Sequence, residues 1–322
     1  MNLKPSDIKL LNYLYHNNRE PLSKIAKATG LSREQVEYKL KKYQSEGIIK
    51  QFFTLFNYPK LGYNILAGLL LKIRTDKLEE FSRKFEKDKN VIERGEIFGD
   101  YDFYFTLIFK DEAELNEYVS KLFEKNKNII MDYIVLNTFF SELYPIKFLE
   151  GDTKKEEMFA IMPEKQFSEK INLDKRDKII LKMFSEDARV KIVDIAHKLN
   201  ISPELALYKV RKLEKEKIIL GSRMFFDVNK VGYYFADIFL EINNFSTEVQ
   251  DKIKKFARKH KNIDIVNLLI NKPNCMFQIV FKSQEELLNT IKDIKNLFQN
   301  DYVKTKILFP KYNEKVRPLP FY

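Results

Sequence analysis

The sequence has 322 residues, a formal net charge of +11 and one cysteine, Cys275, so it is long enough for two or more domains with cores of their own. The single cysteine excludes an intramolecular disulfide and a cysteine-based zinc cluster within one chain. The longest apolar stretches, such as 65–71, are far too short to cross a bilayer and no apolar signal segment opens the chain, so we expect a soluble cytoplasmic protein with no membrane contact.

The positive charge is concentrated in particular segments. Residues 1–50 carry ten basic and five acidic side chains, and residues 172–221 carry twelve and eight. Residues 51–150 carry fourteen basic and seventeen acidic side chains, whereas residues 222–322 carry seventeen and eleven. An acidic module between basic ones is more typical of a nucleic-acid-binding protein than a uniform excess of lysine.

The chain contains an internal repeat. A shift of 170 positions aligns residues 3–63 with residues 173–233 without a gap, and the register then shifts by two, so that Phe109 aligns with Phe281. Identical pairs include Asp7/Asp177, Ile25/Ile195, Ala26/Ala196, Ser32/Ser202, Tyr38/Tyr208, Lys39/Lys209, Gly62/Gly232 and Tyr63/Tyr233. Self-similarity over this length indicates that one unit has been duplicated.

Each repeat opens with three short helical patterns, the first of which we expect to start at Asp7 in repeat one and at Asp174 in repeat two. The second pattern ends in a tight turn at 29–31, with the counterpart at 199–201. These turns contain Gly30 and Asn200, the residue types that tolerate a left-handed backbone. A turn of this kind between two short helices predicts a helix-turn-helix.

The third helical pattern has the features of a recognition helix. Ser32 is expected to cap it with Gln35 completing a capping box, and Ser202 caps its counterpart with Pro203 at the first helical position. Val36, Leu40 and Tyr43 form the stripe expected to be buried. The side chains predicted to contact DNA are Ser32, Arg33, Gln35, Tyr38, Lys39, Lys41 and Lys42 in repeat one and Ser202, Tyr208, Lys209, Arg211 and Lys212 in repeat two. A solvated small domain, or one that contacts protein, is the alternative.

After each helical unit the apolar pattern changes to period two. In repeat one it predicts strands over 48–56 and 65–73, a helix over 78–87, strands over 92–97 and 102–109, a helix over 112–124 and a strand over 132–137. In repeat two, strands over 218–228 and 235–242 precede a helix over 247–259. The order after the first strand, strand-helix-strand-strand-helix-strand, is the ferredoxin-like arrangement.

The predicted fold class is therefore α+β, with two copies of a winged helix-turn-helix domain followed by a ferredoxin-like α/β domain. The predicted segments are a helix-turn-helix domain over 1–50, an α/β domain over 51–150, a linker over 151–171, a second helix-turn-helix domain over 172–221 and a second α/β domain over 222–322.

Several motifs resemble the Lrp/AsnC family of transcriptional regulators. They are Ile25-Ala26, Leu31-Ser32, Glu46-Gly47-Ile48-Ile49 and Lys60-Leu61-Gly62-Tyr63, followed by the loop 98–103, Phe-Gly-Asp-Tyr-Asp-Phe. The resemblance implies binding to double-stranded DNA and pairing of the α/β domain with a second copy. It also implies that a small-molecule effector such as an amino acid binds near the loop, through Gly99, Tyr101 and Asp102. The corresponding loop of repeat two has neither the glycine nor the aspartate, so the implied effector site belongs to repeat one. A plain hairpin turn is the alternative.

The two recognition helices differ at their first turns. Pro203 stands where repeat one has Arg33, and Leu205 stands where it has Gln35, so repeat two has lost two hydrogen-bonding groups. We therefore expect repeat one to read more of the sequence and repeat two to hold more of the phosphate backbone. Two assemblies stay open: the two α/β domains pair within one chain, or a homodimer presents four helix-turn-helix units.

Enzymatic interpretations find little support in the sequence. The three histidines, His16, His197 and His260, have no paired-ligand spacing, and no phosphate-binding or nucleophile motif is present. We therefore predict no catalytic residue, no cofactor and no metal site. Two alternatives to a regulator remain: a tetrapyrrole enzyme, because sirohaem decarboxylases share this duplicated plan, and an adaptor that contacts protein without DNA.

Overall fold

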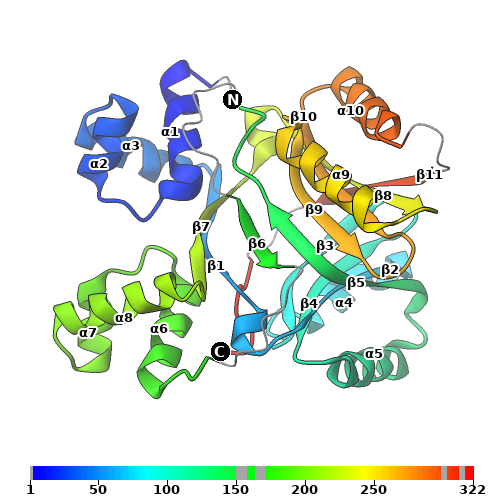
Figure 1. Ribbon diagram of the computed structural model, residues 1–322, viewed down its shortest axis with the longest axis horizontal. Helices are drawn as coiled ribbons and strands as arrows, with labels where there is room; N and C mark the ends of the chain where they lie inside the picture. Colours follow the sequence, from blue (N-terminus) through cyan, green and yellow to red (C-terminus); the bar gives the residue numbers. More distant parts are fainter. Residues whose placement is uncertain (1–2, 150–157, 164–170, 299–302, 312–315) are drawn as a thin grey trace.

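The computed structural model describes residues 3–149, 158–163, 171–298, 303–311 and 316–322 (Figure 1). The two helix-turn-helix domains lie on one side of the molecule, one above the other, and the two α/β domains lie on the other side. No helix within these ranges is both long and apolar enough to span a membrane. The predicted fold class is confirmed, with a winged helix-turn-helix domain and a ferredoxin-like domain in each repeat.

The first helix-turn-helix domain, called here the first head, contains α1 (Pro5–Asn17), α2 (Leu22–Thr29) and α3 (Arg33–Ser45). The second head contains α6 (Lys175–Glu186), α7 (Ile192–Leu199) and α8 (Pro203–Lys215). Gly30 (φ 73°) and Asn200 (φ 51°) end the second helix of each head in the left-handed conformation, as predicted. The expected start at Asp7 is wrong by two residues: α1 begins at Pro5, and Asp7 lies in its first turn, where its side chain accepts from the Lys4 backbone N–H.

Each α/β domain has the ferredoxin-like strand order. Repeat one contains β2 (Ile65–Ile73), α4 (Leu78–Lys84), β3 (Val91–Phe98), β4 (Phe103–Phe109), α5 (Glu112–Asn126) and β5 (Ile130–Leu143), in the order β5-β2-β4-β3. Repeat two contains β8 (Tyr234–Ile242), α9 (Thr247–Lys259), β9 (Ile263–Leu269), β10 (Cys275–Phe281), α10 (Gln284–Asn296) and β11 (Val303–Lys311), in the order β11-β8-β10-β9. Short 3₁₀ turns lie at Pro59–Leu61, Thr75–Lys77 and Val228–Val231.

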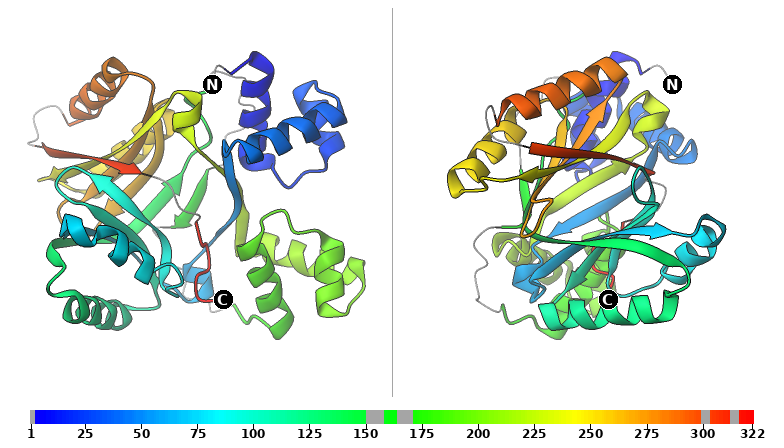
Figure 2. Two further views of the ribbon diagram at one scale, coloured as in Figure 1. Left: turned by 180° about the vertical axis from the view of Figure 1, so that it is seen from behind. Right: turned by 90° about the vertical axis from the view of Figure 1, so that its right-hand side faces the viewer.

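The two sheets join edge to edge within one chain. Strand β11 pairs with β3, with Phe309 opposite Phe98, and β5 pairs with β9, with Phe140 opposite Leu268. Together with the β2–β5 pairing, these contacts close the strands of both domains into a ring. Helices α4 and α5 cover one sheet from outside, and α9 and α10 cover the other (Figures 1 and 2). Of the two assemblies left open by the sequence, the structure shows pairing within the chain.

A two-stranded ribbon connects the heads to this ring. It consists of β1 (Ile49–Phe56) and β7 (Ile219–Phe226), which run antiparallel with Phe53 opposite Arg223. Each head packs on the α/β domain of the other repeat. Leu14 and Tyr15 of the first head share a core with Tyr233, and Phe184 of the second head shares one with Tyr58. The repeats are therefore interlocked.

Two further segments, part of the linker and the end of the chain, also cross between the repeats. The linker predicted over 151–171 contains a strand, β6 (Phe159–Met162), which pairs with β5, while 151–157 and 164–170 lie outside the described residues. The apolar end of the chain, which belongs to repeat two, packs on repeat one, where Phe321 stacks on Tyr63 at 4.0 Å between ring centroids. Leu319 is buried in the core of the second head. Both segments add to the contacts that fix the heads against the ring.

Candidate nucleic-acid interface

The recognition helices α3 and α8 each bury one face and expose the other. Val36, Leu40 and Tyr43 are buried on α3, as predicted, and Ala206, Val210 and Leu213 are buried on α8. The opposite faces carry Tyr38 and Tyr208, whose exposed fractions are 67% and 64%. The two heads therefore present their recognition helices in the same way.

The first turn of α3 combines a helix cap with the groups predicted to read bases. Ser32 Oγ accepts from the Gln35 backbone N–H at 3.1 Å, and Gln35 Oε1 accepts from the Ser32 backbone N–H at 2.8 Å. Bidentate reading of adenine uses both the oxygen and the nitrogen of a glutamine side chain. Gln35 would therefore have to release its cap to make that contact, whereas Arg33 is exposed beside it.

Lys39 and Lys209, both predicted to contact DNA, are held by partners inside their own heads. Lys39 bonds Asp7, which also accepts from Tyr43 Oη at 2.6 Å. Lys209 Nζ lies 2.9 Å from Asp177 Oδ1. Burial would raise the pKa of Asp7, but the bonds from Lys39 and Tyr43 outweigh it and lower that pKa. These lysines brace the recognition helix against the first helix, so a DNA contact from either would require its ion pair to open.

The other basic side chains predicted to contact DNA differ in whether they already form an ion pair within their own head. Lys41 Nζ lies 2.8 Å from Glu37, and Lys42 and Lys212 lie 3.9 and 3.8 Å from acidic residues four positions along their helices. Exposed pairs of this kind are worth about 0.3–0.5 kcal/mol and open readily. Arg33 and Arg211 are exposed and form no ion pair among the described residues. Each recognition helix therefore presents one exposed arginine that forms no ion pair within the described residues.

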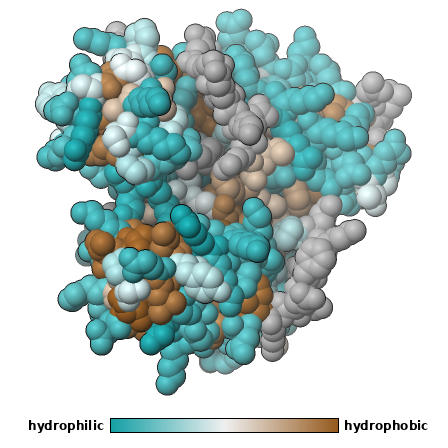
Figure 3. Space-filling model, turned by 60° about the vertical axis from the view of Figure 1, so that its left-hand side comes forward, coloured by the Kyte–Doolittle hydropathy of each residue, from teal (hydrophilic) through white to brown (hydrophobic). Residues whose placement is uncertain are grey.

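The surfaces around the two recognition helices differ in polarity. The second head exposes Val193 (56%) and Leu205 (38%) where the internal alignment gives the first head Ser23 and Gln35. Figure 3 shows the consequence: hydrophobic residues gather over the second head, at lower left, more than over the first. The second head thus keeps the shape of a recognition domain but offers fewer hydrogen-bonding groups.

Contacts between the heads fix their separation. Arg19 Nη1 of the first head lies 2.8 Å from Glu214 Oε1 on α8, and its guanidinium lies 4.4 Å from the centre of the Phe184 ring. The equivalent arginine of the second head, Arg189, lies 5.3 Å from the Phe52 ring. A charged group over an aromatic face adds about 0.5–2 kcal/mol. The heads are therefore presented as one unit.

The loop 98–103, predicted to bind an effector, packs against β11. Gly99 has φ 140°, and a Cβ there would lie 2.5 Å from Leu308 Cδ2, so this position requires glycine. Asp102 Oδ2 accepts from the Ile73 backbone N–H at 2.9 Å. Tyr101 is buried, and it borders a cavity of about 70 Å³. All three residues have structural partners, so effector binding by this loop remains a prediction.

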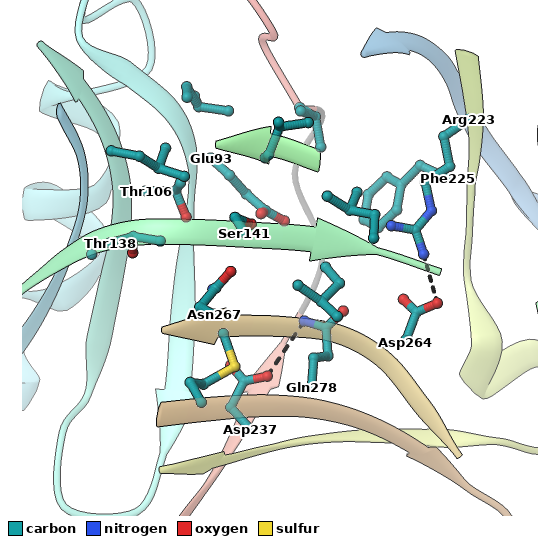
Figure 4. Close-up of a pocket in the computed structure, with 18 of the residues that line it drawn as sticks. Glu93, Thr106, Thr138, Ser141, Arg223, Phe225, Asp237, Asp264, Asn267 and Gln278 are labelled. Carbon is teal, nitrogen blue, oxygen red and sulfur yellow. Dashed lines mark hydrogen bonds and ion pairs between the residues drawn. The ribbon is translucent and has the colours of Figure 1, made fainter. Parts of the chain in front are cut away.

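A larger cavity, called here the central cavity, lies between the two sheets and the ribbon. Its volume is about 220 Å³ and its lining is mainly apolar (Figure 4). The polar side chains that line it include Glu93, Thr106, Thr138, Ser141, Arg223, Asp237, Asp264, Asn267 and Gln278. This site could not be predicted from the sequence, because its lining comes from strands far apart in the chain. A signal was present in Asp237 and Gln278, polar residues inside otherwise apolar strands.

One corner of the central cavity holds a buried polar network. Arg223 Nη2 lies 2.6 Å from Asp264 Oδ1, and Arg223 Nε donates to Tyr15 Oη at 2.6 Å. All three side chains are almost fully buried. The single arginine of the cavity lining is therefore already paired with a carboxylate.

Comparison with known proteins agrees with this architecture. A family described as winged helix-turn-helix DNA-binding matches residues 3–50 and 173–219. The HTH-type transcriptional regulator FL11 of Pyrococcus furiosus is 34% identical over 114 residues, which are 35% of this chain and 76% of that protein. The HTH-type transcriptional regulator Ptr1 of Methanocaldococcus jannaschii is 30% identical over 114 residues, 35% of this chain and 77% of that protein. These relatives therefore match a region about the size of one repeat.

Among solved structures, the siroheme decarboxylase NirDL resembles the whole chain. It aligns with a TM-score of 0.60 over 97% of this chain and 94% of its own, at 18% sequence identity. At that identity, the likeness shows a shared fold only. The chain belongs to the Lrp/AsnC family of HTH-type transcriptional regulators, with two family units joined in one polypeptide.

Proposed function

We propose that this protein binds a specific, non-palindromic site in double-stranded DNA through two unequal heads. The observation that carries the proposal is the pair of recognition helices, α3 and α8, exposed in the same way but with different side chains at their first turns. Two like recognition helices at a fixed separation match two half-sites on one duplex. A protein with this role works where DNA is accessible, in the cytoplasm.

The first head supplies most of the base reading in this proposal. Arg33 can donate two hydrogen bonds to guanine, and Gln35 can pair with adenine. The second head has Pro203 and Leu205 at these positions, so it contributes mainly phosphate contacts from Arg211 and Lys212. Leu205 can still contact a thymine methyl group. The half-site under the second head is therefore read less strictly.

A single chain is the functional unit in this proposal. The family resemblance implies pairing of α/β domains, and the β3–β11 and β5–β9 contacts make that pairing within one polypeptide. A homodimer would have to use another surface. An amino-acid effector at Gly99, Tyr101 and Asp102 stays part of the proposal, although Asp102 would have to release the Ile73 backbone N–H to bind one.

The tetrapyrrole enzyme is the second candidate, because NirDL shares the fold over nearly the whole chain. A solved complex of NirDL contains an iron-uroporphyrin III analogue, and uroporphyrins carry many carboxylates. The central cavity is lined by the carboxyl groups of Glu93 and Asp237 and by the Arg223–Asp264 pair, whose charges cancel, and no histidine lines it in the described chain. A polyanion would meet like charges there. This chemistry favours the regulator.

Selection of bound duplexes from a random pool, followed by titration of the enriched duplex at two salt concentrations, tests the proposal. We expect an asymmetric motif that binds at least about a thousandfold more tightly than random DNA. We also expect affinity to fall steeply with salt, because each neutralised phosphate releases counterions. No enrichment and no binding at low salt would overturn the proposal. Absorbance titration with iron-uroporphyrin would then test the enzyme, and its failure would leave the adaptor.

A further inference from the structure

The central cavity is separate from the DNA-facing surfaces and from the loop 98–103. It lies between strands of both α/β domains and the ribbon, and apolar side chains such as Leu70, Phe239 and Met276 form much of its wall. An apolar cavity with a few converging polar groups is the usual form of a small-molecule site. The charge and hydrogen-bonding capacity of its polar groups determine which class of molecule it would bind.

Asp237 is the most unusual of these groups. It lies on β8 inside the ring, is 8% exposed, and accepts a hydrogen bond from Gln278 Nε2 at 3.3 Å. No lysine or arginine of the described chain forms an ion pair with it, and burial raises its pKa to about 7. A carboxylate buried without a counter-charge is costly, and a bound cation would relieve that cost.

Two further acceptors lie on the walls of the same cavity. Asn267 Oδ1 is buried and has no hydrogen-bond partner among the described residues. Glu93 contributes a second carboxylate from the opposite sheet. Figure 4 shows these side chains together with Asp237 around strand β5. The cavity is therefore rich in acceptors, and its positive group, Arg223, is committed to Asp264.

The acceptor-rich wall belongs mainly to repeat two. In the sheet register Asp237 stands opposite Gln278, and at the corresponding place in repeat one Gly68 stands opposite Thr106. The symmetric packing of two ferredoxin-like sheets therefore does not require a carboxylate here. A buried acid that packing does not require is a good indicator of binding.

We propose that the central cavity binds a small apolar molecule that carries a protonated amine, with the Asp237 carboxylate as counter-ion and Asn267 as a second acceptor. The volume sets the scale: a cavity of roughly 150 Å³ holds benzene, so about 220 Å³ suits an aromatic ring with a short aminoalkyl chain. Anionic molecules are disfavoured by the unpaired carboxylate.

The cavity is also placed so that a bound ligand would contact the ribbon, which connects to the heads. Phe53 and Phe225 of the ribbon line the cavity, and the same two strands lead directly into the heads. A ligand that shifts the ribbon far enough to break the Arg19–Glu214 contact between the heads would change the separation of α3 and α8. This regulatory half rests on the proposed DNA-binding function, whereas ligand binding itself does not.

The test compares three probes of similar size on the full chain at pH 8: 2-phenylethylamine, the neutral 2-phenylethanol and the anionic phenylacetate. Isothermal titration calorimetry measures binding, without DNA. We expect the amine to bind at least about tenfold more tightly than the alcohol, because one charge-assisted hydrogen bond contributes about the free energy that a tenfold ratio of affinities requires. We expect phenylacetate not to bind, because its carboxylate would be repelled by that of Asp237. Equal affinities for the amine and the alcohol, or no binding of the amine, would overturn the proposal. The comparison of the three probes needs only the wild-type chain, so it does not depend on whether a variant folds.

Asp237→Asn and the matched surface control Asp76→Asn then locate the site. Asp237→Asn should remove the preference for the amine over the alcohol, whereas Asp76→Asn should retain it. Amine binding that survives Asp237→Asn unchanged would contradict the assignment. DNA titration with and without saturating amine separates the two proposals. If the chain binds the amine but no DNA, the cavity assignment holds and the proposed DNA-binding function is rejected. If the chain binds DNA with the same affinity with and without the amine, the proposed effect of the ligand on the heads is rejected.

Discussion

The two heads have one architecture and two surfaces. Residues that make the fold have equivalents in both: Ser32 and Ser202 cap the recognition helices, and Lys39 and Lys209 bond an aspartate of the first helix. The exposed residues differ, with Gln35 in the first head and Leu205 in the second. Caps and buried pairs define the domain, whereas exposed side chains define what it contacts. The same domain can therefore read bases in one repeat and serve mainly as an anchor in the other.

The α/β domains show the same kind of difference inside the molecule. Repeat two buries Arg223 with Asp264, and the internal alignment gives repeat one Phe53 and Ile92 at these positions. All four residues line the central cavity. The apolar residues need no partner, whereas the ionic pair depends on both charges.

Removing one charge of that pair should give the largest effect. Asp264→Ala leaves Arg223 buried without its carboxylate, which we expect to cost about 3–5 kcal/mol in the free energy of unfolding. The double variant Arg223→Phe/Asp264→Ile copies repeat one and should recover most of the loss. Urea denaturation of the two variants and the wild type measures both values. If the double variant is as unstable as Asp264→Ala, the apolar residues of repeat one cannot replace the ion pair of repeat two at this place.

Asp237 should make the stability of repeat two depend on pH. Burial raises the pKa of this carboxyl to about 7, so the folded state keeps a proton that the unfolded chain releases above about pH 4. The wild type therefore loses stability as pH rises from about 4 to about 7, and Asp237→Asn does not. The variant should match the wild type near pH 4 and exceed it by on the order of 4 kcal/mol at pH 8. Thermal unfolding at both pH values measures the gap. A gap that does not change with pH would contradict a buried, ionisable Asp237.

Substitutions in the two recognition helices should separate reading from anchoring. Gln35→Ala should weaken binding to the selected motif by roughly tenfold or more and leave binding to random DNA nearly unchanged. Arg211→Ala should weaken both about equally and lower the salt dependence by about one phosphate contact. Fluorescence anisotropy titrations with both duplexes at several salt concentrations measure these effects. Equal, sequence-independent losses from both variants would refute the division of labour.

Much of the fold could be predicted because its signals are local. Gly30 and Asn200 after a short apolar helix, and a serine cap two residues later, indicate a helix-turn-helix without knowledge of distant contacts. The ferredoxin-like order followed from strand and helix patterns in sequence. The closure of the ring could not be predicted, because the edges of β3 and β11 would show the same pattern if they paired with another chain.

In the candidate sites, too, the features that depend on local sequence could be predicted and those that depend on distant contacts could not. The exposed face of α3 could be predicted from its helical wheel, since burial on one helix follows its periodicity. The engagement of Lys39 by Asp7 could not, because the partners lie 32 residues apart and either could have faced solvent. The central cavity was out of reach, since Asp237 and Glu93 become neighbours in one cavity only when two sheets from different repeats close on each other.

Converting the second head toward the first should give the smallest effect. The variant Pro203→Arg/Leu205→Gln restores the two groups that the first head has at its first turn, and its capping residue, Ser202, is unchanged. We expect the selected motif to gain base preference in its second half, with an affinity gain of about threefold to tenfold for the new site, since one added base contact is worth about 1 kcal/mol or more. Leu205→Ala is the matched control, because it removes the apolar side chain without adding a polar one, and it should leave the motif asymmetric. Repeating the selection with both variants gives the result directly. If the converted head still reads no bases, then its distance from the DNA, rather than its side chains, makes the two heads unequal.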